Sequence, residues 1–597
     1  MLNARLYRVA FVPFLLALAV ASFALGARPP ALTSSLAPDA FEGARAYGEL
    51  HDLAARYPDR RPGSAGDEEL ADRVAQVFRA LGGTAAGGFS VRTERFQAQT
   101  IDGEQTLMNV VAERPGSSSE SPILILAHRD AAARGSVAEL SGTAALLELA
   151  RVLAARETKR TVVLASTSGG SGGDAGATHL LASIGTGLDA AIVLGDVAGA
   201  KVNRPAVVPY SNGYGSAPLA LALTLSDMLA NQAQFQAGSP SLFGQLAHLA
   251  FPLTVGEQGV IDRAGVPAVL LQVSGELGPA PTTAVSAERM EAFGRVALSA
   301  VDALDSAPNV SHAMQHGLVL GRKTVPAWAI ALLVLTGLLP VLAVLLDGLA
   351  GARRRRLNVG RWVLWTLSCA LPFFTCALFA YLLGVLGIVG AAPPVPTLIT
   401  ALPFSGDAVP AVVAVVLTFA LSWMLWAVLV KRLGWGVRPD AAVAGLALLL
   451  LALAVTALAW LRNPYAALLA LPALHLWLLL ASPELRPRRT VCGGLVALGL
   501  LPLLALGVFY ADRLGMGVDG LAWMALLLLA GGHMGFVSAA MWSVAFGCGA
   551  AAVLLSFSHH EVAPALGGDG RSEVTIRGPR SYAGPGSLGG TASALRR

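Results

Sequence analysis

Long apolar segments dominate the second half of this sequence and constrain its fold more than any other feature. Residues 326–557 form a nearly continuous series of apolar blocks. Lipid cannot hydrogen-bond to an open backbone, so an apolar block of about 20 residues is expected to cross a membrane as an α-helix. Only 14% of the residues are charged, against about 25% in soluble proteins. We therefore predict a multi-pass membrane protein.

One predicted span precedes these blocks. We interpret Tyr7–Ala27 as an uncleaved anchor, with a cleaved signal peptide as the alternative. Gly531-Gly532-His533 is expected to split the final stretch, Leu521–Phe557, into a short interfacial piece and one span. The other predicted spans are Pro326–Leu346, Trp362–Val389, Val409–Val430, Ala441–Leu461, Tyr465–Ala481 and Val491–Tyr510. This gives about eight spans, of which seven form a helical domain at 326–557.

Basic residues in the short loops predict the orientation, because cytoplasmic loops are enriched in Lys and Arg. Three alternate loops carry them: Arg353–Arg356; Lys431, Arg432 and Arg438; and Arg486, Arg488 and Arg489. We expect these loops, the N-terminus and a disordered tail at 558–597 to be cytoplasmic, which leaves residues 28–325 extracytoplasmic. The preference for Arg over Lys, with abundant Ala and Gly, indicates a bacterial protein and therefore a bacterial cell membrane.

Other compositional features exclude some classes of function. All four cysteines fall in apolar blocks, so the segment outside the membrane has no disulfide framework. Few ionisable residues lie within the predicted spans, which argues against ion-coupled transport. His475 is expected to pack between helices rather than to relay protons. No feature of the sequence indicates nucleic-acid binding.

Residues 28–320 have the pattern of a globular α/β domain. Short apolar runs such as Ile123–Leu126 and Val162–Leu164 are typical of strands buried at the centre of a sheet. Amphipathic segments alternate with these runs, which predicts a mixed sheet covered by helices. Strands are predicted at 90–96, 106–112, 122–127, 161–165, 190–194 and 266–272, and helices at 41–54, 68–81, 142–155, 175–184, 217–230 and 286–304.

Five motifs of this domain, in their order and spacing, resemble the M28 family of zinc aminopeptidases. They are Arg61-Pro62-Gly63-Ser64-Ala65-Gly66, Met108-Asn109-Val110-Val111-Ala112, Ile123 through Asp130, Ser141 through Arg151, and Gly256-Glu257-Gln258-Gly259 leading into Ala264–Ala268. The resemblance covers about residues 40 to 306 and implies a mixed sheet covered by helices. The order of domains, with such a domain followed by a helical bundle, is similar to that of the GPI-transamidase attachment subunit and of the endoplasmic-reticulum M28 metallopeptidase.

The resemblance also implies which residues would hold two zinc ions. His128 and Asp130 match the family's His-x-Asp, and Asp196 matches a later Asp ligand. The bridging Asp falls on Ala138, and the Glu-Glu pair that supplies general base and ligand falls on Gly170 and Ser171. The last His falls in Gly278-Pro279-Ala280-Pro281, which contains none.

Because Ala and Gly side chains cannot ligate a cation, the expected metal site is degenerate. We interpret His128 and Asp196 as vestigial metal ligands and Asp130 as a vestigial catalytic residue. We therefore expect no bound cofactor. The favoured function is a non-enzymatic binding or scaffolding protein that recognises a peptide, a glycan or a membrane-protein partner. One alternative is an active membrane-bound zinc aminopeptidase whose metal site is rearranged, drawing on Glu139, Asp174, His179 or Glu257. Another is a lipid-handling or transport protein.

Overall fold

The computed structural model describes residues 4–34, 40–82, 88–238, 240–307, 314–389, 392–404, 406, 408–434, 441–480 and 489–558. The predicted tail at 558–597 lies outside these residues except for its first position. Three of the basic loop residues, Arg438, Arg486 and Arg488, are also outside them.

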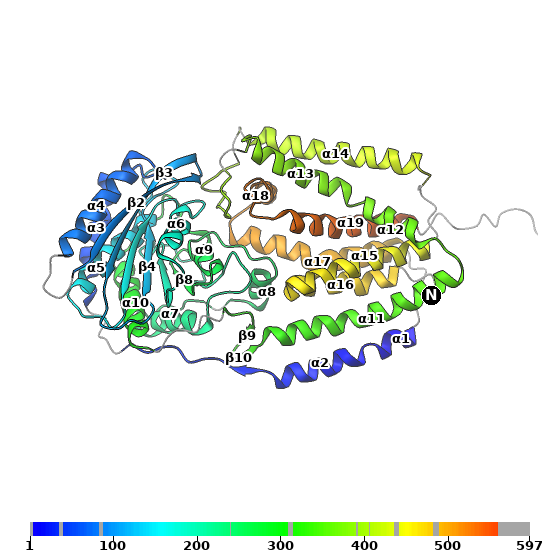
Figure 1. Cartoon of the computed structure of the whole chain (residues 1–597), viewed down its shortest axis with the longest axis horizontal. Helices are drawn as coiled ribbons and strands as arrows, with labels where there is room; N and C mark the ends of the chain where they lie inside the picture. Colours follow the sequence, from blue (N-terminus) through cyan, green and yellow to red (C-terminus); the bar gives the residue numbers. More distant parts are fainter. Residues whose placement is uncertain are drawn as a thin grey trace, which may run out of the picture. The chain divides into compact units, whose positions relative to one another are not determined.

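A seven-stranded mixed sheet forms the centre of the globular domain, as the apolar runs predict (Figure 1). Across the sheet the strands are β2 (Ser90–Thr100), β3 (Gly103–Arg114), β5 (Val162–Thr167), β4 (Ile123–His128), β6 (Ala190–Leu194), β8 (Ala268–Leu271) and β7 (Val207–Val208). The four strands β5, β4, β6 and β8 are parallel. Strand β3 pairs antiparallel with β5, β7 pairs antiparallel with β8, and β2 pairs antiparallel with β3. The carboxyl ends of the four parallel strands therefore meet at one edge of the sheet.

Helices cover both faces of this sheet. Alternate residues of β4 point to opposite faces, so Ile123 and Ile125 belong to one apolar core, and Leu124 and Leu126 to the other. The larger core is completed by α3 (Gly43–Arg56), α4 (Ala65–Leu81), α5 (Ser141–Ala154), α7 (Leu219–Gln232) and α10 (Ala287–Ser306). The smaller core is completed by α6 (Ala175–Ile184) and α9 (Gln258–Arg263). Burial on both faces explains why the central strands are apolar throughout.

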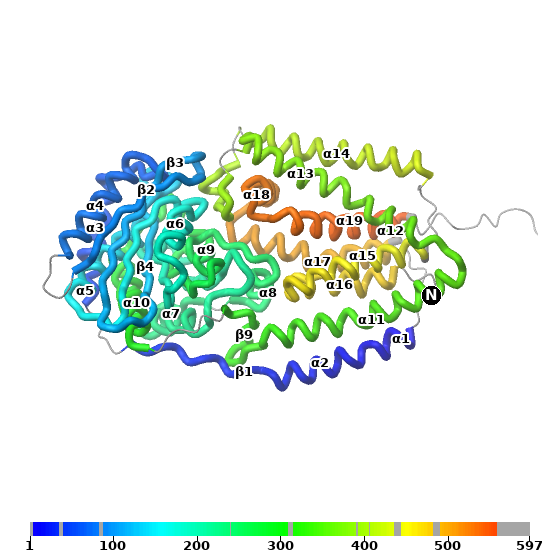
Figure 2. The backbone as a smooth tube through the Cα atoms, in the orientation of Figure 1, coloured from blue at the N-terminus to red at the C-terminus, as the bar shows by residue number. Residues whose placement is uncertain are grey.

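The chain passes between the helical region and the globular domain twice, and a small antiparallel sheet connects the two crossing segments. Strand β1 (Gly26–Ala27) pairs with β10 (Lys323–Val325), which pairs with β9 (Leu318–Leu320). The pairing brings the end of α2 (Val12–Phe23) to the start of α11 (Ala327–Arg354), and these two helices lie side by side (Figure 2).

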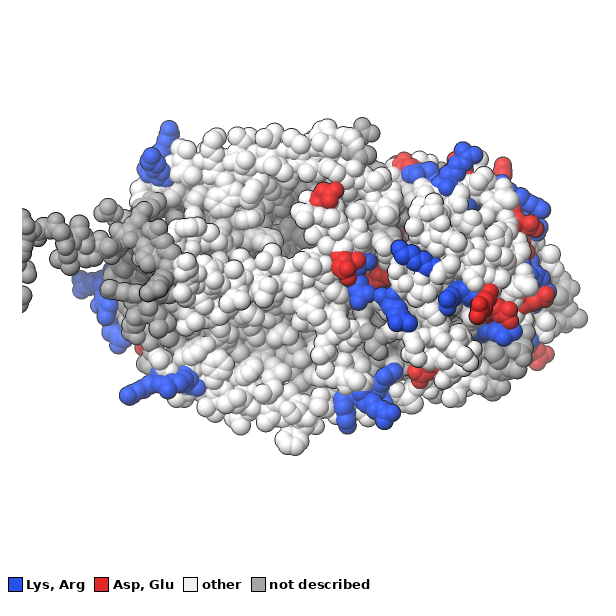
Figure 3. Space-filling view, turned by 180° about the vertical axis from the view of Figure 1, so that it is seen from behind, with Lys and Arg blue, Asp and Glu red and all other residues white. Residues whose placement is uncertain are grey.

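Within the described part of the chain, seven helices are long and apolar enough to cross a membrane: Ala4–Phe23, Ala327–Arg354, Val359–Val385, Val409–Arg432, Val443–Arg462, Thr490–Arg513 and Phe536–Phe557. The remaining predicted span, Tyr465–Ala481, corresponds to a shorter apolar helix of 17 residues, α16 (Pro464–Leu480). The final stretch divides as expected into α18 (Val518–Ala530) and α19 (Phe536–Ser558). The space-filling view shows the bundle almost free of charged side chains between its two ends, whereas the globular domain carries both signs (Figure 3).

One feature of the helical region differs in detail from the prediction. The span predicted at 362–389 is present as one candidate span, Val359–Val385, but it contains two helices, α12 (Val359–Ser368) and α13 (Leu371–Val385). Pro372 lies in the first turn of α13, where a proline is well tolerated because the N–H that it lacks has no partner within the helix. The bundle also includes α14 (Val409–Arg432), α15 (Ala441–Arg462) and α17 (Arg489–Arg513).

Candidate functional site

The predicted site residues lie at the edge of the sheet where the parallel strands end. His128 is the last residue of β4, Asp130 follows it, and the Gly-rich segment 168–173 follows β5. Asp196 follows β6 in the same way. Turns after neighbouring parallel strands converge there, which is the common location of ligand sites in open α/β sheets.

His128 is paired with a glutamate that lies 129 positions later in the sequence. Its Nδ1 is 3.7 Å from Oε2 of Glu257, and the Glu257 side chain is only 1% exposed. The other oxygen of Glu257 accepts a hydrogen bond of 2.6 Å from the Thr167 hydroxyl. Burial lowers the pKa of His128, but Glu257 together with the nearby charges of Asp130 and Glu139 raises it to about 9. At neutral pH the pair is therefore a buried imidazolium–carboxylate ion pair.

Asp130 binds the backbone of the Gly-rich segment. Its carboxylate accepts hydrogen bonds from the backbone N–H groups of Gly170 (3.1 Å) and Ser171 (2.9 Å), and from the Ser171 hydroxyl (2.5 Å). These are the two positions on which the resemblance places the catalytic Glu-Glu pair. The carboxylate therefore holds this segment in place.

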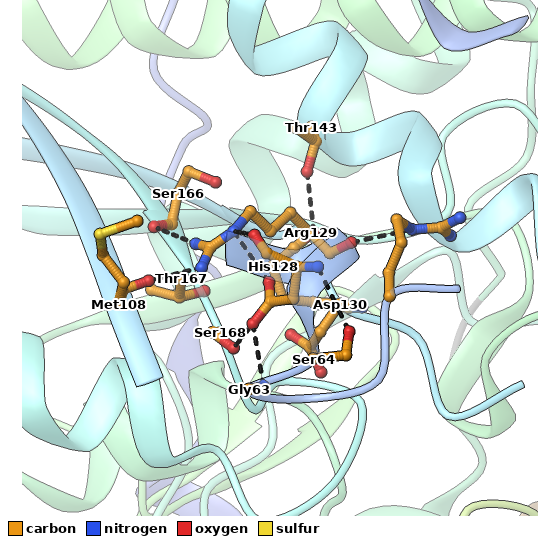
Figure 4. Close-up of polar contacts among 12 residues, drawn as sticks. Gly63, Ser64, Met108, His128, Arg129, Asp130, Thr143, Ser166, Thr167 and Ser168 are labelled. Atoms are coloured by element: carbon orange, nitrogen blue, oxygen red, sulfur yellow. Dashed lines mark hydrogen bonds and ion pairs between the residues drawn. The ribbon is translucent and has the colours of Figure 1, made fainter. Parts of the chain in front are cut away.

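Arg129, between His128 and Asp130, is fully buried beneath the site (Figure 4). Its guanidinium donates hydrogen bonds to the carbonyls of Met108 (2.6 Å) and Ser166 (3.2 Å) on the adjoining strands, and its Nε lies 2.9 Å from Oδ1 of Asp67. Asp67 also accepts from the backbone of Gly63 and the hydroxyl of Ser168. This network fixes the end of β4 to β3, β5 and the start of α4.

Two further carboxyl groups lie within electrostatic range of His128. Burial raises the pKa of Glu139 to about 7, although the charge of His128 opposes that rise. Burial and the charge of Glu257 raise the pKa of Asp174 well above its usual range. Asp174 is fully buried and begins α6 in a left-handed conformation, with φ of +46°. These raised pKa values favour the neutral, protonated form of the Glu139 and Asp174 carboxyl groups, which lowers the net negative charge around His128.

Two candidate residues have other partners. Oδ1 of Asp196 accepts from the backbone N–H groups of Ala198 (3.2 Å) and Gly199 (2.6 Å), which closes its own turn. His179 stacks on Phe96 with 4.0 Å between ring centroids, and its Nε2 lies 3.8 Å from Glu94. Neither has an interaction with His128 or Asp130 among the contacts of the described residues.

The described residues do not fit the zinc pair that the resemblance implies. No group of three or more His, Cys, Asp or Glu side chains within the described part of the chain is placed to hold a metal ion. The space at position 170 is also filled, because a Cβ added to Gly170 would lie 2.4 Å from Cβ of His128 and 3.0 Å from Cδ of Glu257.

A segment from the helical region lies against the outer side of the Gly-rich segment. This covering segment, residues 392–404, connects α13 to α14. A Cβ added to Gly172 would lie 3.0 Å from Cγ2 of Thr397, and one added to Gly173 would lie 2.6 Å from Cβ of Pro393. Thr397 is only 3% exposed. Glycine at 172 and 173 therefore permits close packing between the two segments.

Comparisons with known proteins found one family match and a set of similar solved structures. Residues 109–241 match Peptidase family M28. Solved structures similar to the chain include a zinc aminopeptidase from Bacillus subtilis (13% identity, 44% of this chain and 94% of that one, TM-score 0.35), LapB from Legionella pneumophila (15%, 47% and 78%, 0.37) and an Acidobacteriales bacterium glutaminyl cyclase (18%, 47% and 99%, 0.35). A search of curated proteins found no match.

The sheet and the family match define the class of this protein. It carries an M28 peptidase-like domain, built on the seven-stranded sheet, joined to a bundle of membrane-type helices. It is thus a multi-pass membrane protein with a metallopeptidase fold.

His128 and Asp130 follow a predicted strand, and the structure places both at the edge of the sheet where that strand ends. The sequence did not establish the partner of His128. Glu257, Glu139 and Asp174 were candidates without a predicted direction, because no local pattern sets the path of the segments that carry them. One signal for Glu257 was present, since Gly256-Glu257-Gln258-Gly259 is among the motifs that resemble the M28 family.

Proposed function

We propose that the M28-like domain of this protein is a non-catalytic binding or scaffolding domain. One observation carries the proposal: the position of the family's catalytic glutamates is occupied by Gly170, whose N–H binds Asp130 and whose side-chain space is filled by His128 and Glu257. General-base catalysis typically contributes a factor of about 10²–10⁴ in rate. Without a base at this position, binding is the function that the geometry supports.

The covering segment also favours binding over peptide processing. It buries the Gly-rich side of the former catalytic edge beneath the chain's own residues, including Pro393 and Thr397. A ligand or partner would then contact the remaining surface of the M28-like domain. Peptide, glycan and membrane-protein partners remain the candidate classes.

Metal content and peptidase activity test this proposal on the full chain purified in detergent. We expect substoichiometric zinc by elemental mass spectrometry and no chelator-sensitive release of amino acids from peptide substrates. The matched variant His128→Ala is expected to change neither quantity. Two tightly held zinc ions per chain, with activity that His128→Ala removes, would show instead that the site is a rearranged metallopeptidase.

We also propose that the M28-like domain lies on the extracytoplasmic side of a bacterial cell membrane. Arg353 and Arg354 at the end of α11, and Lys431 and Arg432 at the end of α14, lie at helix ends remote from the domain. Basic residues are enriched on the cytoplasmic side, which supports this orientation.

Cysteine labelling in whole cells tests the orientation. In a cysteine-free background, Gly187→Cys on the exposed surface of the domain should react with a membrane-impermeant maleimide. Arg354→Cys should react only after lysis. The reverse pattern would place the domain in the cytoplasm.

A further inference from the structure

A cavity of about 530 Å³ lies inside the bundle, next to the M28-like domain. Helices α15, α16, α17 and α19 form its walls, and loops of the M28-like domain line one end. Small-molecule sites commonly have volumes of about 300–1,000 Å³. The cavity is distinct from the edge of the sheet that carries His128 and Asp130, since neither residue lines it.

The cavity extends deep into the membrane-spanning region. On α19 its lining runs from Ser538 to Cys548, which corresponds to about 15 Å at 1.5 Å per residue. The hydrocarbon core of a bilayer is about 30 Å thick, so this length corresponds to about half of the membrane. Small and apolar side chains such as Ala452, Ala470 and Leu503 line this depth. Such a lining is suited to a hydrocarbon chain.

The end of the cavity next to the M28-like domain is positively charged. Arg263 ends α9 and Arg462 ends α15, so one guanidinium comes from each part of the protein. Neither forms an ion pair with a carboxylate among the described residues, and no Asp or Glu is among the residues that line the cavity. The charge favours an anionic group at this end.

We propose that this cavity binds a membrane lipid whose headgroup carries a phosphate. The phosphate lies between Arg263 and Arg462, and an acyl chain fills the apolar depth. A free phosphate would occupy only the charged end.

Lipid retention by the full chain tests the proposal. After purification in mild detergent, native mass spectrometry should show about one anionic phospholipid bound per chain. Ala470→Phe fills the apolar part of the cavity and is expected to reduce the retained lipid by at least about tenfold, which corresponds to about 1.4 kcal/mol. The control Ala420→Phe, on the exposed face of α14 and outside the cavity, should leave retention unchanged. Equal retention in the two variants would refute the site.

A second experiment tests the headgroup and does not depend on a core substitution. Detergent-purified protein is titrated with phosphatidylglycerol and with phosphatidylcholine, and bound lipid is measured. We expect a preference of about tenfold for the anionic lipid, which is lost in the double variant Arg263→Gln/Arg462→Gln and kept in Arg322→Gln, an exposed cation outside the cavity. No preference in the unaltered chain, or displacement of the lipid by inorganic phosphate alone, would overturn the assignment. None of these outcomes depends on whether the M28-like domain is catalytic.

Discussion

Replacing Asp67 with Ala is expected to destabilise the folded chain by about 3–5 kcal/mol, because it leaves a buried cation without its counter-charge. Arg129 and Asp67 are 0% and 1% exposed, and no water can replace the lost carboxylate. The variant also removes the acceptor for the Gly63 N–H and the Ser168 hydroxyl. Proteolysis of the full chain in detergent at increasing urea concentrations measures the change in the free energy of unfolding of the M28-like domain.

A surface ion pair of the same chemical type provides the control. Arg61 and Asp102 form two hydrogen-bonded contacts, of which the Nε–Oδ2 distance is 2.7 Å, but their side chains are 40% and 34% exposed. Asp102→Ala is therefore expected to cost less than about 1 kcal/mol. Equal losses in the two variants would mean that burial does not set the strength of the Asp67–Arg129 pair.

The same pair helps to fix the positions of His128 and Asp130. Arg129 anchors the turn after β4 to the carbonyls of two strands, and the residues on either side of it are held by that anchor. Glu257 lies at ion-pair distance from His128, and the Gly170 and Ser171 N–H groups bind Asp130. Ion pairs and hydrogen bonds within the domain thus engage both side chains.

The sequence predicted the sheet well because burial imposes a simple pattern on its central strands. Ala190–Leu194 and the helix Ala175–Ile184 have the predicted bounds, and β4 differs by one residue at each end. The short elements β7, α8 (Leu242–Ala250) and α9 were not predicted. Helix α8 has only nine residues, fewer than the window of about 11–18 residues over which a helical period can be recognised.

The sequence predicted a shared location only for those site residues that are close together along the chain. His128, Arg129 and Asp130 follow one strand, and their shared location follows from that strand alone. The pairing of His128 with Glu257 depends on the path of two turns that join different strands. The placement of Thr397 against Gly172 depends on how the helical region packs, which no local pattern encodes. At the positions where this sequence lacks the family's ligands, the local structure is set by tertiary packing, which the sequence alone does not reveal.

Restoring the family's glutamate at position 170 is expected to destabilise the domain rather than to create a peptidase. The Cβ of Gly170→Glu would lie 2.4 Å from Cβ of His128, and overpacking of this kind costs about 1–3 kcal/mol. The new carboxylate would also be buried beside Glu257 and Asp130 without a free cation, and an unpaired buried charge adds several kcal/mol. We expect a total loss of at least about 3 kcal/mol in the free energy of unfolding, measured by proteolysis in urea.

The control for this variant is Gly187→Glu, which adds the same side chain at an exposed glycine with open space around it. A surface substitution of this type changes stability by no more than about 0.5 kcal/mol. If Gly170→Glu were as well tolerated as Gly187→Glu, the space beside His128 would be available to a side chain. The site would then have room for its side chains, although the ligands at positions 138 and 171 and the last His would still be missing. A large loss at position 170 alone would instead mean that His128 and Glu257 have been repacked into the core of the domain, so that no substitution at one or two ligand positions recovers the enzyme.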